Sequence, residues 1–351
     1  MQRQGEQLRV TAQLIDAGSG ALDWSNSWDR PAGDIFAVQT EIAGQVTSHL
    51  GPYGALAVAD RAQVKRKRPE DLGGYETLLL ARESLRRFTP EGAQQGLELL
   101  QQAVAKDPQL ARGWTSMVHA DLMSSRWADD PMWFLQAAVV AGRRAVELDP
   151  THAYDDAAYG EALGSVGDLA QAEVEYGKAL ELNPSAADIL VFYTGWAMSF
   201  GKPEAGAAAA DRAIRLNPNY PRWAAGAYLG YAYFAVGRYG DVVRVLARLP
   251  EESRAAADYV LEGSSLAMAD HIEEAKVAVA KALVLDPETS IERQISDPSV
   301  GDLDARFTEA MHRAGFPACA SAATLAKFDK PVRLPECEAE RAKAANKAQA
   351  G

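Results

Sequence analysis

The side chains best suited to chemistry are scattered along the chain instead of gathered in motifs. No two of the five histidines have the His-x-x-x-His spacing that places two metal ligands on one face of a helix. They are His49, His119, His152, His271 and His312. The acidic pairs at 129–130 and 155–156 could bind a cation, but adjacent acids more often cap a helix and interact with its dipole. We therefore predict no metal site, no cofactor, and surface or capping positions for the histidines.

Motifs for catalysis are missing from the sequence as well. It contains no glycine-rich phosphate loop, no His/Cys metal cluster and no nucleophile motif. We therefore predict no catalytic residue and a chain that is not an enzyme. The two cysteines, Cys319 and Cys337, flank a polar segment that contains prolines. Two free thiols are the favoured interpretation, and a pairing that clips the C-terminal tail back stays open.

Composition limits the kinds of partner. The 351 residues carry a formal charge of −12, and nucleic acid or an anionic membrane would repel so acidic a chain. One basic run at 65–68 is too short to outweigh this charge. No stretch approaches the ~20 apolar residues that span a bilayer, and the polar start lacks the apolar core of a signal peptide. Unless residues precede Met1, we predict a cytoplasmic protein that binds no nucleic acid and does not insert into membranes.

One recurring phrase organises the chain. Similar hexapeptides, from AVAKDP to ALVLDP, end at Pro108, Pro150, Pro184, Pro218 and Pro287. The intervals are 42, 34, 34 and 69 residues, and the longest contains a degenerate copy that ends at Pro250. A period of about 34 residues is typical of stacked helical hairpins, which bury their apolar faces only against their neighbours. The sequence therefore predicts six hairpins between about Tyr75 and Pro287.

Residue types within each period agree with paired helices. Small residues such as Gly160 and Ala172 allow two antiparallel helices to approach closely. Gly167 suits the turn between the helices, where a left-handed residue satisfies the last carbonyls. The second helix should end before each proline, as at 149–150 and 183–184, because the residue before proline disfavours the helical region.

This pattern resembles the tetratricopeptide repeat (TPR). The positions that carry the resemblance are Gly160, Ala172, Tyr176, Ala179, Pro184, Gly263, Ala275, Ala282 and Pro287. The resemblance covers about 210 of the 351 residues and implies a mainly α fold, a right-handed superhelix of about six helical hairpins. It also implies a concave groove that binds a protein or peptide partner without a cofactor.

The predicted organisation has five parts. They are a partial α/β segment (1–52), a basic linker or helix (53–73), the repeat array (74–287), a C-terminal capping helix (288–317) and a polar tail (318–351). The predicted repeats span 74–108, 111–150, 153–184, 187–218, 221–250 and 256–287. The second repeat is eight residues longer than the period, and its surplus near 124–133 contains Trp127 and Trp133. Local packing of these tryptophans is the favoured interpretation, and an aromatic binding protrusion stays open.

The first fifty residues differ from the array. Residues 7–16 alternate apolar and polar side chains, as a strand with one buried face does. A turn and a second strand at 24–28 follow, and Asp34 can cap a helix over 34–50 that has one apolar stripe. We therefore predict a β-hairpin followed by an amphipathic helix.

This segment resembles the closing part of the TolB-like domain that precedes TPR arrays in some bacterial proteins. The resemblance rests on 10–16, Trp24, 28–30, 34–39 and 41–42. It implies that Met1 falls inside the domain, as in a truncated gene or a degenerate remnant. Proteins with this domain and TPRs include class III adenylate or guanylate cyclases and winged-helix regulators, so a cyclase name could attach to this chain without cyclase chemistry.

The first helix of each hairpin should line the concave face. By their phase in the repeat, the candidate partner-binding residues are Arg112, Thr115, His119, Tyr154, Glu161, Asp188, Val191, Met198, Tyr231, Phe234, Val260 and Ser264. This partly apolar and aromatic set suits a partner helix or a hydrophobic peptide. We predict a non-enzymatic scaffold in bacterial signalling or regulation, with self-association open. The alternative is the regulatory C-terminal part of a class III adenylate cyclase-like protein.

Overall fold

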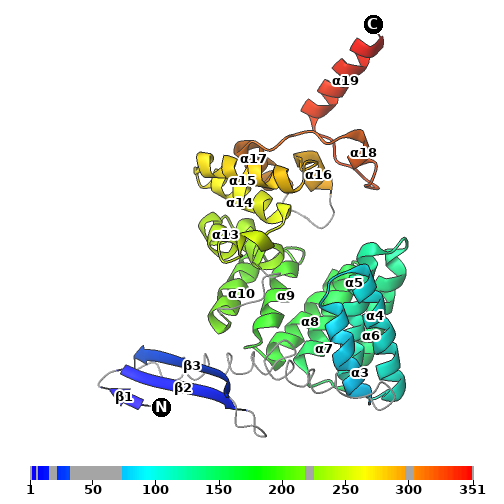
Figure 1. The fold of residues 1–351 in the computed structure, drawn as a ribbon, viewed down its shortest axis with the longest axis vertical. Coiled ribbons are helices and arrows are strands. Elements are labelled where there is room, and N and C mark those ends of the chain that lie inside the picture. Colours follow the sequence, from blue (N-terminus) through cyan, green and yellow to red (C-terminus); the bar gives the residue numbers. More distant parts are fainter. Residues whose placement is uncertain are drawn as a thin grey trace. The chain divides into compact units, whose positions relative to one another are not determined.

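The computed structural model describes residues 2–4, 7–15, 22–31, 73–217, 225–296 and 304–349 (Figure 1). The N-terminal strands form an antiparallel sheet in the order β1-β2-β3, with bounds Gln2–Gln4, Gln7–Ile15 and Leu22–Pro31. The predicted hairpin is confirmed, and the three-residue β1 is an addition that the sequence pattern did not indicate. Arg9 pairs with Asp29 across β2 and β3, at 2.6 Å between Nε and Oδ1. The predicted helix over 34–50 lies outside the described residues.

Six helical hairpins follow, as predicted from the period. In chain order they are α3 (Gly74–Leu85) and α4 (Pro90–Lys106), α5 (Ala111–Ser124) and α6 (Pro131–Leu148), α7 (Ala153–Ser165) and α8 (Leu169–Leu182), α9 (Ala187–Ala197) and α10 (Pro203–Leu216), the π-helical η4 (Ala225–Gly230) continued by α12 (Tyr231–Ala235) and α13 (Tyr239–Leu246), and α14 (Ala256–Met268) and α15 (Ile272–Leu285). The fold is therefore the predicted α-solenoid.

Small residues set the distance between the two helices of a hairpin. A Cβ added at Gly160 of α7 would lie 3.0 Å from Cδ2 of Tyr176 and 3.1 Å from the carbonyl oxygen of Ala172, both in α8. Ala172, Tyr176 and Ala179 are all fully buried. Gly263 has the same role in the last hairpin, where its Cβ would approach Ala278 and Ala275. Alanine and glycine at these positions therefore allow the close helix packing that the sequence predicted.

Helix ends also follow the prediction. Asp149 and Asn183, each before a proline, leave the helical region with φ of −140° and −139° at the ends of α6 and α8. Gly167 has φ of +88°, and Asp168 donates its backbone N–H to the Leu163 carbonyl at 3.0 Å. This left-handed turn satisfies the carbonyl groups at the end of α7.

The second and fifth hairpins depart from the regular repeat. In the second, residues 125–130 between α5 and α6 form a short 3₁₀ helix, η3 (Ser125–Trp127), and a turn, and α6 has 18 residues where α8 has 14. Trp127 packs against Phe88 of the first repeat with ring centroids 5.8 Å apart, yet it remains 41% exposed. Trp133 is 59% exposed. In the fifth hairpin, α13 has only eight residues, in agreement with its degenerate final phrase.

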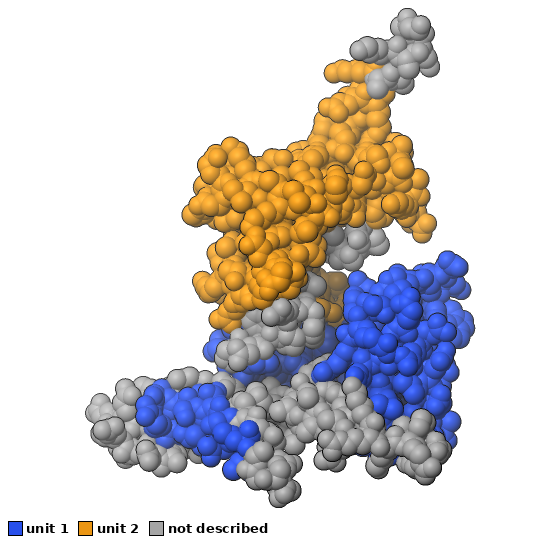
Figure 2. Space-filling model, in the orientation of Figure 1, with its two compact units in different colours: residues 1–193, 211–219 blue, residues 194–210, 220–351 orange. Residues whose placement is uncertain are grey.

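The described chain divides into two compact units (Figure 2). Unit 1 contains residues 1–193 and 211–219, and unit 2 contains 194–210 and 220–351. The division falls within α9 and α10, so the array predicted as one span at 74–287 consists of two units. Unit 1 includes the first three hairpins, whose core contains Leu78, Leu100 and Val118.

Beyond the last hairpin, the described residues of unit 2 form four helices. They are α16 (Ile291–Ser296), α17 (Asp304–Ala314), α18 (Ala322–Leu325) and α19 (Pro335–Gln349). The predicted capping helix corresponds to α17, which ends before Gly315 at φ of +90°. The segment predicted as a polar tail (318–351) contains α18 and α19.

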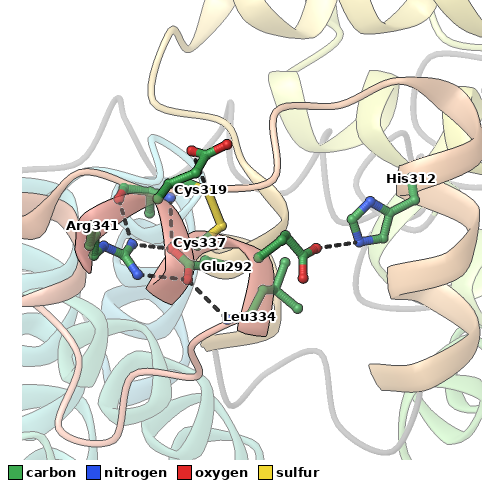
Figure 3. Close-up of a disulfide and its surroundings, with 9 residues drawn as sticks. Glu292, His312, Cys319, Leu334, Cys337 and Arg341 are labelled. Atoms are coloured by element: carbon green, nitrogen blue, oxygen red, sulfur yellow. Dashed lines mark hydrogen bonds and ion pairs between the residues drawn. A yellow bond between two sulfur atoms is a disulfide. The ribbon is translucent and has the colours of Figure 1, made fainter. Parts of the chain in front are cut away.

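A disulfide joins Cys319 to Cys337 (Figure 3), so the prediction of two free thiols is wrong. The segment around it is tied to α16 through the buried carboxylate of Glu292. That carboxylate accepts hydrogen bonds from the backbone N–H groups of Ala320 and Leu334, at 2.9 and 3.0 Å, and forms an ion pair with Arg341. Burial alone would raise the pKa of Glu292, but Arg341 and the two amides together hold it below its usual value. These contacts bring the two cysteines together, which no local sequence pattern indicates.

Candidate functional site

Polar side chains on the first helices of unit 1 form contacts from one repeat to the next. Arg82 Nε of α3 donates to Ser116 Oγ of α5 at 3.0 Å, and the Tyr154 hydroxyl of α7 donates to Asp188 Oδ2 of α9 at 3.0 Å. Each pair is 34 residues apart in the sequence. The repeat period therefore places equivalent positions of successive first helices side by side. This set of first-helix side chains is called the inner face of unit 1.

At the centre of the inner face, Asp155 links two repeats. Its Oδ1 accepts hydrogen bonds from the Thr115 hydroxyl of α5 and from His152 Nδ1, the latter at 2.9 Å. The Asp155 side chain is fully buried, and its second oxygen, Oδ2, has no hydrogen-bond partner. The hydrogen bonds to Oδ1 join α5 to α7 and fix their relative arrangement. The unpaired Oδ2 costs free energy, because a buried carboxylate oxygen has lost its hydrogen bonds to water.

His119 and Glu161 form a half-buried pair on the inner face. His119 Nε2 lies 3.7 Å from Glu161 Oε2, and the two side chains are 29% and 16% exposed. Burial lowers the pKa of His119 to about 4, with a further lowering by the charge of Arg82. Burial raises the pKa of Glu161 to about 7. At neutral pH the pair thus presents a neutral imidazole and a carboxyl group near its titration midpoint, which can donate or accept hydrogen bonds.

The predicted residues of unit 1 are distributed between surface and interior. Arg112 is exposed, and Tyr154 is half-buried beside Asp188. Burial raises the pKa of Asp188, although the hydrogen bond from Tyr154 opposes this. Thr115, Asp188 and Val191 are buried, so they support the inner face instead of contacting solvent.

The predicted residues of unit 2 lie mostly in its interior. Met198 and Tyr231 are half-buried, whereas Phe234, Val260 and Ser264 are fully buried. The expectation of an open surface at these three positions is therefore wrong. The reason is that the chain's own α17 packs on the first helix α14 and reaches α12.

Sequence reasoning missed several members of the inner face. Arg82, Ser116 and Asp155 all contact a neighbouring repeat, and Phe192 lies beside His119 with ring centroids 6.2 Å apart. The 34-residue offset could have identified the pair of Arg82 and Ser116. It could not have identified Thr115 with Asp155, which are 40 residues apart because the second repeat is longer.

Metal ligation finds no support in the part of the chain that the structure describes. Among these residues no group of three His, Cys, Asp or Glu side chains could hold a metal ion. Of the two acidic pairs, 129–130 serves a helix start, since Asp130 accepts a hydrogen bond from the Met132 backbone N–H at the start of α6. Within the same ranges, no helix is both long and apolar enough to span a bilayer.

Comparison with known sequences gives a partial match. No protein-family model matches the chain. Putative adenylate cyclase 3 of Rhizobium meliloti (strain 1021) is 26% identical over 117 residues, which are 33% of this chain and 20% of that protein. The match thus covers about a fifth of the length of this curated relative.

Comparison with solved structures identifies the fold. The Cut9–Hcn1 hetero-tetramer of the APC/C is similar with a TM-score of 0.56 and 12% identity, over 77% of this chain and 48% of that chain. TTC0263, a thermophilic TPR protein of Thermus thermophilus, is 22% identical over 52% of this chain and 92% of that chain, with a TM-score of 0.41. The similarity to the Cut9–Hcn1 structure agrees with the fold described above, an α-solenoid of stacked helical hairpins.

Proposed function

We propose that the chain is a non-enzymatic scaffold that binds a protein or peptide partner through the inner face of unit 1, in bacterial signalling or regulation. The observation that supports this most directly is the half-buried pair of His119 and Glu161, which come from two successive first helices and lie beside the ring of Phe192 from a third. A rigid row of hydrogen-bonding groups suits an extended or helical peptide segment, because the scaffold loses little conformational entropy on binding.

Peptide selection tests this function. A displayed library of random peptides is selected against the full chain, and the selected peptides are measured against Glu161→Lys and Val174→Lys variants. Val174 lies on the second helix α8 and is 49% exposed, so it serves as a matched surface control. We expect Glu161→Lys to weaken binding at least tenfold and Val174→Lys to leave it unchanged. Equal affinity for both variants would argue against the inner face.

A second candidate is the regulatory C-terminal part of a class III adenylate cyclase-like protein. It is supported by the 117-residue similarity to putative adenylate cyclase 3. In this interpretation, residues 1–52 are the closing part of a TolB-like domain, and the effector domain is encoded further upstream in the same polypeptide. Coding sequence in frame before Met1 that encodes a cyclase domain would favour this candidate. An in-frame stop codon there would contradict it.

A further inference from the structure

The inner face of unit 2 is covered by a helix of the same chain. The phase of the repeat places Tyr231, Phe234, Val260 and Ser264 on the first helices, at positions equivalent to the inner face of unit 1. Phe234, Val260 and Ser264 have no exposed surface. The helix that packs against this face is α17, which lies beside α14 and α15 (Figure 1).

α17 presents one apolar face to these helices. Its residues Phe307, Ala310, Met311 and Ala314 follow the spacing i, i+3, i+4 and i+7, and none is more than 1% exposed. Phe307 lies between two aromatic rings of α12, with its centroid 6.0 Å from that of Tyr231 and 5.3 Å from that of Phe234. The rings of Phe307 and Phe234 meet edge to face at 85°. Apolar anchors at this spacing are the pattern of an amphipathic helix bound in a groove.

The packing of α17 differs from that of the next repeat in a solenoid. Each of α5 and α7 packs mainly on the preceding second helix, α4 or α6, and less on the preceding first helix. α17 does the reverse, because it packs chiefly on the first helix α14 and less on the second helix α15. It also reaches back one further repeat, where Arg306 Nη1 donates to the Ala235 carbonyl at 2.5 Å. α17 therefore occupies the groove side of unit 2 and does not extend the stack.

The ion pairs of α17 involve exposed side chains outside its apolar face. Arg313 Nη2 is 2.6 Å from Asp270 Oδ1, and His312 Nε2 is 3.2 Å from Glu336 Oε1. All four of these side chains are at least 39% exposed, and exposed ion pairs contribute little to stability. The apolar face centred on Phe307 therefore supplies most of the attachment.

We propose that the inner face of unit 2 is a second binding groove, for an amphipathic helix with an aromatic residue followed by apolar residues at i+3, i+4 and i+7, those at i+3 and i+7 being small. α17 is the intramolecular occupant of this groove, and a partner helix of the same pattern competes with it. This site is independent of the inner face of unit 1. Because the groove is filled in cis, its apparent affinity for a partner is reduced by the small fraction of chains in which α17 is displaced.

A peptide with the sequence of residues 304–316 tests the proposal. The fluorescently labelled peptide is titrated into the full wild-type chain and into the Phe307→Ala chain, and binding is followed by anisotropy. We expect the Phe307→Ala chain to bind at least tenfold more tightly, because its own helix has lost the aromatic anchor. A peptide carrying the same Phe307→Ala change should not bind, and adding Phe234→Ala to the receptor should abolish binding.

Two further measurements keep the test decisive if Phe307→Ala fails to fold. The milder Arg306→Ala/Arg313→Ala chain should also bind the peptide more tightly than wild type does. In the wild-type chain, amide hydrogens of α17 should exchange faster than those of α14 and α15, and the unlabelled peptide in excess should accelerate them. The proposal is overturned if the folded variants bind no better than wild type, or if α17 exchanges as slowly as α14. α17 would then be a permanent part of the core.

The disulfide between Cys319 and Cys337 bears on where the protein folds. The chain has two cysteines, and both are used in the bond that fastens α19 to the segment after α17. Cys337 is fully buried, and the adjoining Glu292 network places the two residues together. Because cytosolic thiols are kept reduced, we infer that this part of the chain acquires its structure in an oxidising compartment, contrary to the cytoplasmic location that the sequence predicts.

Thiol trapping in intact cells of the native host tests this inference. Cells that express the full chain are quenched in acid, and free thiols are then labelled with a maleimide-coupled polymer that retards the chain in a gel. We expect no retardation unless the sample is first reduced, when two additions should occur. Two additions without prior reduction would overturn the inference, and the reduced sample controls for access of the reagent.

Discussion

Gly142 of α6 tests whether close packing between repeats determines the stability of unit 1. A Cβ added there would lie 2.9 Å from Tyr159 Cα and 2.9 Å from Tyr159 Cδ2 of α7. The Cα is a backbone atom, so it cannot rotate away as a side chain can. Gly177 of α8 is the matched control, because it is also inside a second helix but has no atom within 4 Å of an added Cβ.

The two substitutions to alanine should act in opposite directions. Replacing a helical glycine by alanine favours the helix by about 1 kcal/mol. Gly177→Ala, which meets no neighbour, should therefore raise the free energy of unfolding by about that amount. Gly142→Ala gains the same term but must force two helices apart, and overpacking costs roughly 1–3 kcal/mol. Since the obstacle is backbone, we expect a cost near the upper end and a net loss of about 1–2 kcal/mol.

Urea unfolding of the full chain, followed by circular dichroism, measures the difference. Repeat arrays need not unfold in one step, so the midpoint of the first transition and the hydrogen exchange of α6 and α7 are compared across the three chains. The expected order of midpoints is Gly177→Ala, wild type, Gly142→Ala. A Gly142→Ala chain that is as stable as wild type, or more stable, would refute the role assigned to this contact.

Three other perturbations probe charge, the disulfide and the first turn. Burial raises the pKa of Asp121 to about 7, so folding takes up a proton, and this group should add about 2–3 kcal/mol of stability as pH falls from 8 to 5. The urea midpoint of Asp121→Asn should lack this gain at low pH, and that of the exposed control Asp129→Asn should keep it. The same dependence of the midpoint on pH in wild type and Asp121→Asn would contradict the raised pKa of Asp121. Cys337→Ser should destabilise the C-terminal segment by about 3 kcal/mol, because it opens an 18-residue loop. Hydrogen exchange should accelerate in α19 and not in α5. Unchanged exchange in α19 would show that the Glu292 network holds this helix in place without the disulfide. Phe88 has φ of +50°, so Phe88→Gly should relieve about 1 kcal/mol of backbone strain. It should also lose about 1 kcal/mol from the ring contact with Trp127, so the thermal midpoint should change little. A midpoint lowered by more than about 8 °C would show that the ring contact contributes much more to holding the first two repeats together.

The repeat period predicted much of the fold because it reflects the residue types that helix contacts, turns and helix ends require locally. Gly160, Gly167 and Asn183 each satisfy a rule that depends on a few neighbouring residues, namely close approach, a left-handed turn and a helix end before proline. These rules recur along the array, so the order and type of the helices could be derived without long-range information. The same period explains the contact of Tyr154 with Asp188, since equivalent positions of successive repeats are neighbours.

Other features depend on contacts that no period encodes. The apolar stripe of α17 indicated a helix with one buried face, but not that this face would cover Phe234 on the groove side. Cys319 and Cys337 meet because the carboxylate of Glu292 accepts hydrogen bonds from the backbone N–H groups of Ala320 and Leu334, which lie close to the two cysteines in the sequence. Thr115 and Asp155 meet at an offset of 40 residues because of the longer second repeat. In each case the determining interaction joins residues far apart in the sequence.

The central claim is that the inner face of unit 1 binds a partner protein. Site-specific photo-crosslinking in cells tests it most directly, with a photoreactive amino acid placed at His119, at Glu161, or at the second-helix control Val174. We predict a crosslinked product of one defined mass from His119 and Glu161 and none from Val174. Equal crosslinking at all three positions, or crosslinking at Val174 alone, would contradict the claim.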